Sequence, residues 1–597
     1  MQAHTPFSLV SFGGRPLQAG AALTRLSIAA CMFATLMSTG CSHQEKMAAA
    51  PQPRQESANL KTADFSGSSR RKKELVRAPS AALPSALASG GAREDFDAPF
   101  ELEAGSDSQN GVSSWNTEAY DRIFEQRFVS PLTAPLSTFS VDVDTASYSN
   151  VRRYVENGSL PPPGAVRIEE LINYFDYGYQ QPEDEQPLAV YSELSTAPWA
   201  AEHKLLHIGL QGRRIDAENI PPRNLVFLLD VSGSMDSPGK LPLLKRSLTA
   251  LLDTMTEKDT ISIVVYAGAS GLVLPPTPAS YRARIERAFH RLSAGGGTNG
   301  AEGINLAYQV AERSFQQGGV NRVILATDGD FNVGTSSQSE LVRLIEKKRD
   351  SGVFLTVLGF GMGNYKDSTL EKLADHGNGN YGYIDSFSEA KKILVEEGGA
   401  NLITIARDVK IQVEMNPKLV GAYRLIGYEN RRLQAEDFND DEKDAGEVGA
   451  GHTVTALYEI LDHEQAAQAL SIDPLKYQRP EQQPPAGAES GPWRDSDAAL
   501  RSYEIATIKL RYKRPGEERS RLQQVVVSDE VLAPRATSEA FRFSAAVAGF
   551  GMMLRRSKYR GDASWSQIKR LAGRSMGRDR YGHKRQFLSL VGQAARL

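Results

Sequence analysis

The sequence contains very little cysteine. Only Cys31 and Cys41 occur in 597 residues, and no thiol follows position 41. A region without cysteine forms no disulfide, uses no thiol nucleophile and holds no zinc through sulfur. No Ser/His/Asp combination for nucleophilic catalysis can be assembled either. The sequence therefore does not predict an enzyme.

A strong net charge is also absent. The chain has 69 Lys and Arg against 72 Asp and Glu, for a formal net charge of −3. Such a balance provides no overall attraction to nucleic acid. The glycine-rich stretch "GGGTNG" (295–300) lacks the lysine that a phosphate-binding P-loop requires. We therefore expect neither nucleic acid nor nucleotide as a partner.

The N-terminus has the pattern of an export signal. Arg15 and Arg25 precede the apolar run "LSIAACMFATLM", which is too short to cross a bilayer but is typical of a secretory signal. The following "STGC" resembles a bacterial lipoprotein signal, although Ser38 stands where leucine is usual. The resemblance implies removal of residues 1–40, lipidation of Cys41 and anchoring to a membrane. Ser42, where aspartate would retain a lipoprotein in the inner membrane, favours the outer membrane facing the periplasm.

Residues 41–114 have the composition of a tether. They are rich in Ser, Ala, Pro, Gly and charged residues and show no sustained hydrophobic period. Such a segment buries too little apolar surface to offset its chain entropy. As a flexible chain it would reach roughly 45–55 Å. We expect it to separate a membrane anchor from the folded region.

Residues 222–400 alternate between apolar strands and amphipathic helices. This pattern predicts an α/β fold with a doubly wound, mostly parallel, Rossmann-like sheet. The expected strands are 224–229, 260–266, 322–326 and 353–358. The expected helices are 241–255, 279–292, 302–315, 338–349, 368–376 and 388–396.

The flanking regions, 115–221 and 401–597, have a different pattern of apolar and polar residues. Both contain strands with strict alternation of apolar and polar residues, typical of antiparallel sheets. We therefore expect the α/β block to be inserted into a β-sandwich built from both flanks, with helices at the C-terminus. The spacing of "TEAYDRIFEQRF" (117–128) predicts a further helix, and 461–498 is expected to be a long loop.

Oxygen-bearing side chains follow the strands of the predicted sheet. Asp230, Ser232 and Ser234 follow the first strand in "LDVSGSM", Thr298 stands in "SAGGGTNG", and Asp328 ends "ILATD". Because ligands of open parallel sheets bind at the carboxyl ends of the strands, these five residues are expected at one edge. Oxygen ligands suit a hard divalent cation.

The set resembles the metal-ion-dependent adhesion site (MIDAS) of von Willebrand factor type A (VWA) domains. The resemblance implies that Ser232, Ser234 and Thr298 bind the cation directly, while Asp230 and Asp328 act partly through water. The cation would be Mg²⁺, with Mn²⁺ or Ca²⁺ as alternatives, and a protein partner would supply an Asp or Glu carboxylate to it. The alternative is a set of helix caps and turns that never holds metal.

Both flanks resemble the regions that accompany the VWA domain in bacterial VWA lipoproteins, through segments such as "STFSVDVDTASYSNVRRYVENG" and "GAYRLIGYENRRL". The resemblance implies a lipid-anchored protein of the cell envelope. Two other functions stay open, a structural scaffold and an accessory factor of an enzyme complex. "DVDTA" (142–146) resembles the paired aspartates of magnesium-dependent phosphatases, but Ala146 replaces the required Thr or Val, which favours polar groups at a strand end.

Overall fold

The computed structural model describes residues 118–597 except 184, 298–299, 330–337, 363–364, 398–401 and 471–502. The expected signal (1–40), Cys41, the tether (41–114), Thr298 and most of the expected 461–498 loop lie outside the described residues. No helix in the described part of the chain is both long and apolar enough to cross a membrane.

The α/β block is built on a six-stranded sheet in the order β6-β5-β4-β7-β8-β9. Neighbours pair in parallel except β5 and β6, which are antiparallel. Every residue of the central strand β4 is buried, as expected for a strand covered on both faces. The strands are β4 (Arg223–Asp230), β5 (Thr260–Tyr266), β6 (Ser270–Pro278), β7 (Val320–Thr327), β8 (Phe354–Phe360) and β9 (Tyr381–Ile384).

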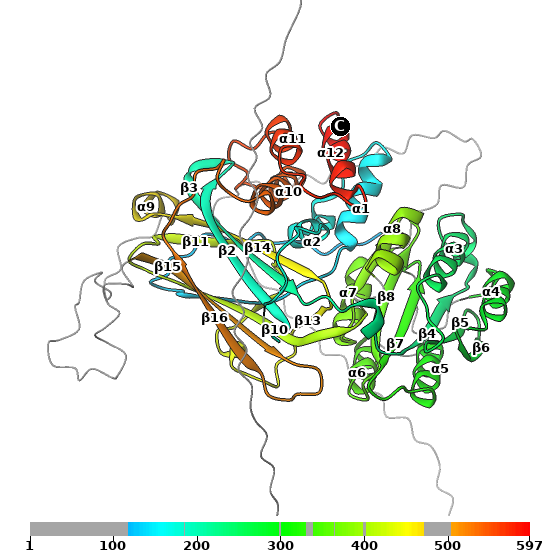
Figure 1. The fold of residues 1–597 in the computed structure, drawn as a ribbon. Coiled ribbons are helices and arrows are strands. Elements are labelled where there is room, and N and C mark those ends of the chain that lie inside the picture. The colour runs from blue at the N-terminus through cyan, green and yellow to red at the C-terminus, as the bar shows by residue number, and fades with distance from the viewer. Residues whose placement is uncertain are drawn as a thin grey trace, which may run out of the picture. The chain divides into compact units, whose positions relative to one another are not determined.

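Helices cover both faces of this sheet (Figure 1). Leu225, Phe227 and Leu229 of β4 pack into one apolar core with α3, α4 and α8, and the alternate residues Val226 and Leu228 pack with α5, α6 and α7. The expected doubly wound fold is therefore confirmed. The helices are α3 (Leu241–Leu252), α4 (Arg282–Arg291), α5 (Gly300–Arg313), α6 (Gln338–Arg349), α7 (Asp367–His376) and α8 (Phe387–Lys391), which continues as a π-helical turn (Lys392–Glu396).

The two flanks together form a β-sandwich, as predicted. One sheet has the order β12-β1-β10-β15-β16, with β13 also paired to β10, and the other has the order β11-β14-β3-β2. Each sheet combines strands from before and after the α/β block, and one apolar core joins them. The strands are β1 (Leu136–Ser140), β2 (Leu188–Ala197), β3 (Ala200–Gly212), β10 (Thr404–Met415), β11 (Ala422–Ile426), β12 (Arg432–Leu433), β13 (Gly446–Gly449), β14 (Thr453–Leu461), β15 (Glu504–Lys513) and β16 (Arg521–Ser528).

The C-terminal helices pack with helices from the N-terminal flank. In Figure 1, α10, α11 and α12 (orange to red) lie near α1 and α2 (cyan), and one apolar core contains residues of all five helices. Serine caps fix two helix starts, since Ser538 accepts from the Phe541 N–H and Ser564 from the Gln567 N–H. The helices are α1 (Ala146–Glu156), α2 (Ile168–Asn173), α9 (His463–Leu470), α10 (Glu539–Arg555), α11 (Trp565–Gly573) and α12 (His583–Ala594).

Two expectations about the flanks were wrong. Residues 118–128 contain no helix, because Tyr120 packs on the core beneath α5–α7 whereas Phe128 packs beside β11 and β14, and Phe124 is 72% exposed. One helical face cannot meet two separate cores. The expected 461–498 loop opens with α9, whose Ala466 is buried against Ala422 and Leu461.

Candidate metal centre

Three parallel strands bring the predicted site residues to one edge of the sheet. Asp230 is the last residue of β4 and lies opposite Tyr266 of β5, while Leu229 pairs with Ala326 of β7. Asp328 follows the end of β7 directly. Asp230 and Asp328 are both fully buried. The structure thus places both predicted carboxylates at the carboxyl ends of adjacent strands.

Hydrogen bonds fix the carboxylate of Asp230. Its Oδ1 accepts the Ser232 N–H at 2.9 Å, and its Oδ2 accepts the hydroxyls of Tyr266 at 3.2 Å and Thr327 at 3.1 Å. Burial raises the pKa of Asp230, and the charge of Asp328 adds to the rise, while the bonds from Ser232 and Thr327 oppose it. These bonds hold the carboxylate in one orientation. A bound cation would favour its charged form.

The serine hydroxyls lie together beside this carboxylate. Ser232 Oγ and Ser234 Oγ are 3.0 Å apart, with Ser232 buried and Ser234 exposed. The glycine-rich loop meets the same turn, since the Gly233 N–H donates to the Gly296 carbonyl at 3.2 Å and the Gly295 N–H to the Val231 carbonyl at 2.8 Å. This places the segment that leads to Thr298 next to the serines.

Lys240 is a member of the site that the sequence analysis missed. Its ammonium Nζ lies 2.8 Å from Asp328 Oδ2, and the side chain is buried together with that carboxylate. The sequence does contain a signal, because a lysine directly precedes the apolar helix "LPLLKRSLTALL" only six residues after Ser234. A buried lysine needs an anionic partner. The nearby motif supplies one.

The donor set fits a hard divalent cation. It offers two buried carboxylates of fixed position and two adjacent hydroxyls, all oxygen. Within the described ranges, no three His, Cys, Asp or Glu side chains group in a way that could hold a metal ion. Of the described residues, hydroxyls as well as carboxylates would therefore be needed to hold a cation at this edge.

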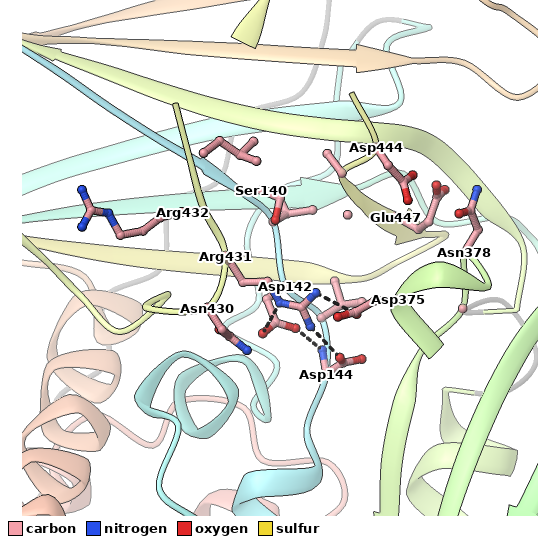
Figure 2. Close-up of a pocket in the computed structure, with 16 residues that line it drawn as sticks. Ser140, Asp142, Asp144, Asp375, Asn378, Asn430, Arg431, Arg432, Asp444 and Glu447 are labelled. Carbon is pink, nitrogen blue, oxygen red and sulfur yellow. Dashed lines mark hydrogen bonds and ion pairs between the residues drawn. The ribbon is translucent and has the colours of Figure 1, made fainter. Parts of the chain in front are cut away.

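A second pair of buried aspartates follows β1 and serves a different purpose. Asp142 and Asp144 both contact the guanidinium of Arg431, at 3.3 Å and 2.9 Å (Figure 2). Asp375 of α7 lies 2.7 Å from the same guanidinium, and Asp144 Oδ1 accepts the Tyr381 N–H at 2.7 Å. We call Asp142, Asp144, Asp375 and Arg431 the Arg431 junction. It joins the sandwich to the α/β block beside a cavity of about 150 Å³, and agrees with strand-end polar groups rather than a phosphatase.

This fold and site define the class. A parallel α/β sheet with D-x-S-x-S after its central strand and a second aspartate after the neighbouring strand characterises a VWA domain, and the family model "von Willebrand factor type A domain" matches residues 224–396. The model "von Willebrand factor" matches residues 114–207, and "Uncharacterized protein YfbK, C-terminal" matches residues 400–597.

Whole-chain similarity gives the family. "Uncharacterized protein YfbK" of Escherichia coli (strain K12) is 41% identical over 502 residues, which are 83% of this chain and 84% of that protein. The chain belongs to the family of YfbK. The human "Inter-alpha-trypsin inhibitor heavy chain H4" is 30% identical over 162 residues, covering 26% of this chain and 17% of that protein.

Solved structures also resemble the chain, at low overall superposition. "von Willebrand factor type A from Catenulispora acidiphila" covers 70% of this chain and 91% of that chain, with 17% identity and a TM-score of 0.36. Proximal thread matrix protein 1 from the mussel byssus, "with zinc occupied MIDAS motif", covers 32% of this chain and 47% of that chain, with 22% identity and a TM-score of 0.26.

Proposed function

We propose that this chain is a lipid-anchored protein of the bacterial cell envelope that captures a carboxylate of a protein partner through a divalent cation. Asp230, Ser232, Ser234, Thr298 and Asp328 would hold the cation, which we expect to be Mg²⁺. The proposal rests mainly on the two fully buried carboxylates and the paired serine hydroxyls at one edge of the sheet.

The chemistry of the donors favours an open site. Mg²⁺ takes octahedral oxygen ligands and readily keeps water molecules, one of which an incoming carboxylate can replace. Here the direct donors are neutral hydroxyls, so they add no charge to the site. Asp230 is oriented by three hydrogen bonds and cannot easily swing away. This set would retain a cation and leave it electrophilic toward an acidic side chain.

Metal titration of the purified full chain tests the centre. We expect Mg²⁺ and Mn²⁺ to raise the free energy of unfolding, by about 2.7 kcal/mol when the metal stands at a hundred times its dissociation constant. Asp230→Ala should abolish this gain. Asp236→Ala removes an exposed carboxylate from the same turn and should keep it. Equal metal stabilisation of all three proteins would refute the site.

Capture from solubilised envelopes then tests the partner. A protein retained by wild-type chain in Mg²⁺, but lost in chelator and with Asp230→Ala, would support carboxylate capture. Partners retained under all three conditions would instead favour a scaffold that binds through its sandwich.

The anchor needs a separate experiment. Metabolic labelling with a palmitate analogue should mark the wild-type protein and leave Cys41→Ser unlabelled, and membrane fractionation should place the labelled protein in the outer membrane. An unlabelled wild-type protein would contradict the lipid anchor without affecting the metal centre.

A further inference from the structure

We propose that Lys240 acts as a resident cation of the metal centre, weakening the binding of the metal itself and strengthening the capture of a carboxylate. This inference rests on the proposed function of the same site. It assigns a role to a residue outside the five-residue motif.

The position of Lys240 is fixed at its backbone. Its N–H donates to the Ser237 carbonyl at 3.0 Å and its carbonyl accepts the Leu244 N–H at 2.8 Å, just before α3 begins. Only 7% of the residue is exposed, and its ammonium lies 2.8 Å from Asp328 Oδ2. The segment that carries the two serines therefore also places the Lys240 ammonium at the site.

Gly361, just beyond the end of β8, makes room for the lysine stem. A Cβ at Gly361 would overlap Cε and Cγ of the Lys240 side chain. The residue has φ of +77°, a conformation that favours glycine. Its carbonyl also accepts the Tyr383 hydroxyl, which holds this backbone in place. The absence of a side chain at Gly361 thus leaves space for the lysine stem, whose ammonium contacts Asp328.

The charges give the lysine a defined effect. Among the described residues of the centre, Asp230 and Asp328 together carry two negative charges, and Lys240 reduces this total to one. A divalent cation then leaves the centre with one net positive charge, which one partner carboxylate neutralises. Without Lys240, the metal alone would neutralise the two aspartates. A buried ammonium near the metal therefore opposes metal binding and favours an anion.

A purely structural role predicts a different pattern. If Lys240 only held Asp328 in place, its removal would disorder a ligand and weaken metal binding and carboxylate capture together. A resident charge instead shifts the two affinities in opposite directions. The signs of two measurements therefore separate the roles.

The test is a Mn²⁺ titration of the full chain, followed by the electron paramagnetic resonance of free Mn²⁺, with and without acetate as the carboxylate probe. We expect Lys240→Met to bind Mn²⁺ at least about tenfold more tightly than wild type. Acetate should tighten Mn²⁺ binding in wild type, because linkage is reciprocal, and should do so at least about threefold less in Lys240→Met.

Two further variants complete the design. Lys240→Arg keeps the charge and should restore the wild-type acetate effect. Lys245→Met removes an equal charge from α3, where its ammonium donates to the Leu292 carbonyl, and should behave as wild type. Unfolding curves in chelator check that each variant is folded, and Lys240→Gln replaces Lys240→Met if that protein does not fold.

If folded Lys240→Met bound Mn²⁺ no more tightly than wild type, or if its acetate effect were unchanged, this inference would be overturned and the proposed function would still stand. A wild-type chain that binds no Mn²⁺ would overturn the proposed function and this inference with it.

Discussion

The described part of the chain contains two pairs of buried aspartates that follow or end strands, and the cationic side chain beside each pair distinguishes them. At the Arg431 junction, one guanidinium contacts Asp142, Asp144 and Asp375. At the metal centre, the cation is the ammonium of Lys240 on Asp328, and two serine hydroxyls lie beside Asp230. A planar guanidinium forms several directed bonds at once, whereas an ammonium is a compact point charge.

The chemistry of the neighbouring cation separates a structural role from a binding role for these two similar carboxylate pairs. Arg431 joins carboxylates from the β1 end and from α7, so its bonds connect segments more than 200 residues apart in sequence. The metal centre instead gathers hydroxyls and carboxylates from neighbouring rim loops. We interpret the Arg431 junction as a structural contact that stabilises the sandwich against the α/β block. We interpret the metal centre as a binding site for an exchangeable cation.

Removing the guanidinium should produce the largest effect on stability. Arg431→Met would leave Asp142 and Asp144, which are 2% and 3% exposed, without their charged partner. Breaking a buried ion pair from one side costs roughly 3–5 kcal/mol. We expect the free energy of unfolding, measured with denaturant in chelator, to fall by this amount.

Arg432→Met is the matched control, because it removes an exposed arginine from the adjacent position. It should change stability by less than about 0.5 kcal/mol. A loss below about 1 kcal/mol in Arg431→Met would mean that the junction does not fasten the two parts.

The buried carboxylate of Glu169, whose pKa responds to the charge of Asp142 in the Arg431 junction, should make the stability of the folded chain depend on pH. Glu169 of α2 is 1% exposed, and among the described residues no other side chain or backbone group donates a hydrogen bond to its carboxylate oxygens. Burial raises its pKa to about 7, with contributions from the charges of Glu429 and Asp142. Because the folded state prefers the protonated form, its stability contribution is full below the unfolded pKa near 4.5 and is lost as the pH rises through about 7.

Between pH 5 and pH 8, wild type should therefore lose roughly 2–3 kcal/mol of stability through this group. Glu169→Gln cannot titrate, so its unfolding free energy should fall by that much less over the same range. Glu257→Gln, at an exposed position, should follow wild type. Parallel pH profiles for wild type and Glu169→Gln would show that Glu169 stays ionised in the folded protein.

Hydrophobic periodicity predicted most elements of the α/β block but missed two strands, one because of its prolines and one because of its short length. The expected helix 338–349 and strand 260–266 match α6 and β5. β6 was missed because Pro275 and Pro276 argue against a strand, although prolines are tolerated at a sheet edge, where β6 lies. β9 was missed because four residues are too few to show alternation.

The site was predictable from sequence only as far as its motif extends. Asp230 and Asp328 lie at the expected edge because parallel strands end together there. The role of Arg431 was not predictable, since it depends on which distant carboxylates the folded chain places beside it, whereas the position of Lys240 close to the motif was a signal that the sequence offered and that was missed. Long-range ion pairs leave no periodic signal. The lipid anchor and Thr298 stay predictions.

The smallest expected change in stability concerns the exposed serine of the metal centre. Ser234→Ala removes one exposed hydroxyl, which lies 3.0 Å from the hydroxyl of Ser232, so the free energy of unfolding in chelator should change by less than about 0.5 kcal/mol. Mn²⁺ affinity should nevertheless fall at least about tenfold, because the cation would lose a direct ligand. Ser237→Ala, also exposed and three residues further along, should change neither quantity. Arg431→Met should show the reverse, with large destabilisation and unchanged Mn²⁺ affinity per folded molecule. The two variants together therefore decide whether stability and metal binding depend on separate sets of residues in this chain. A Ser234→Ala protein with wild-type Mn²⁺ affinity would place the cation elsewhere.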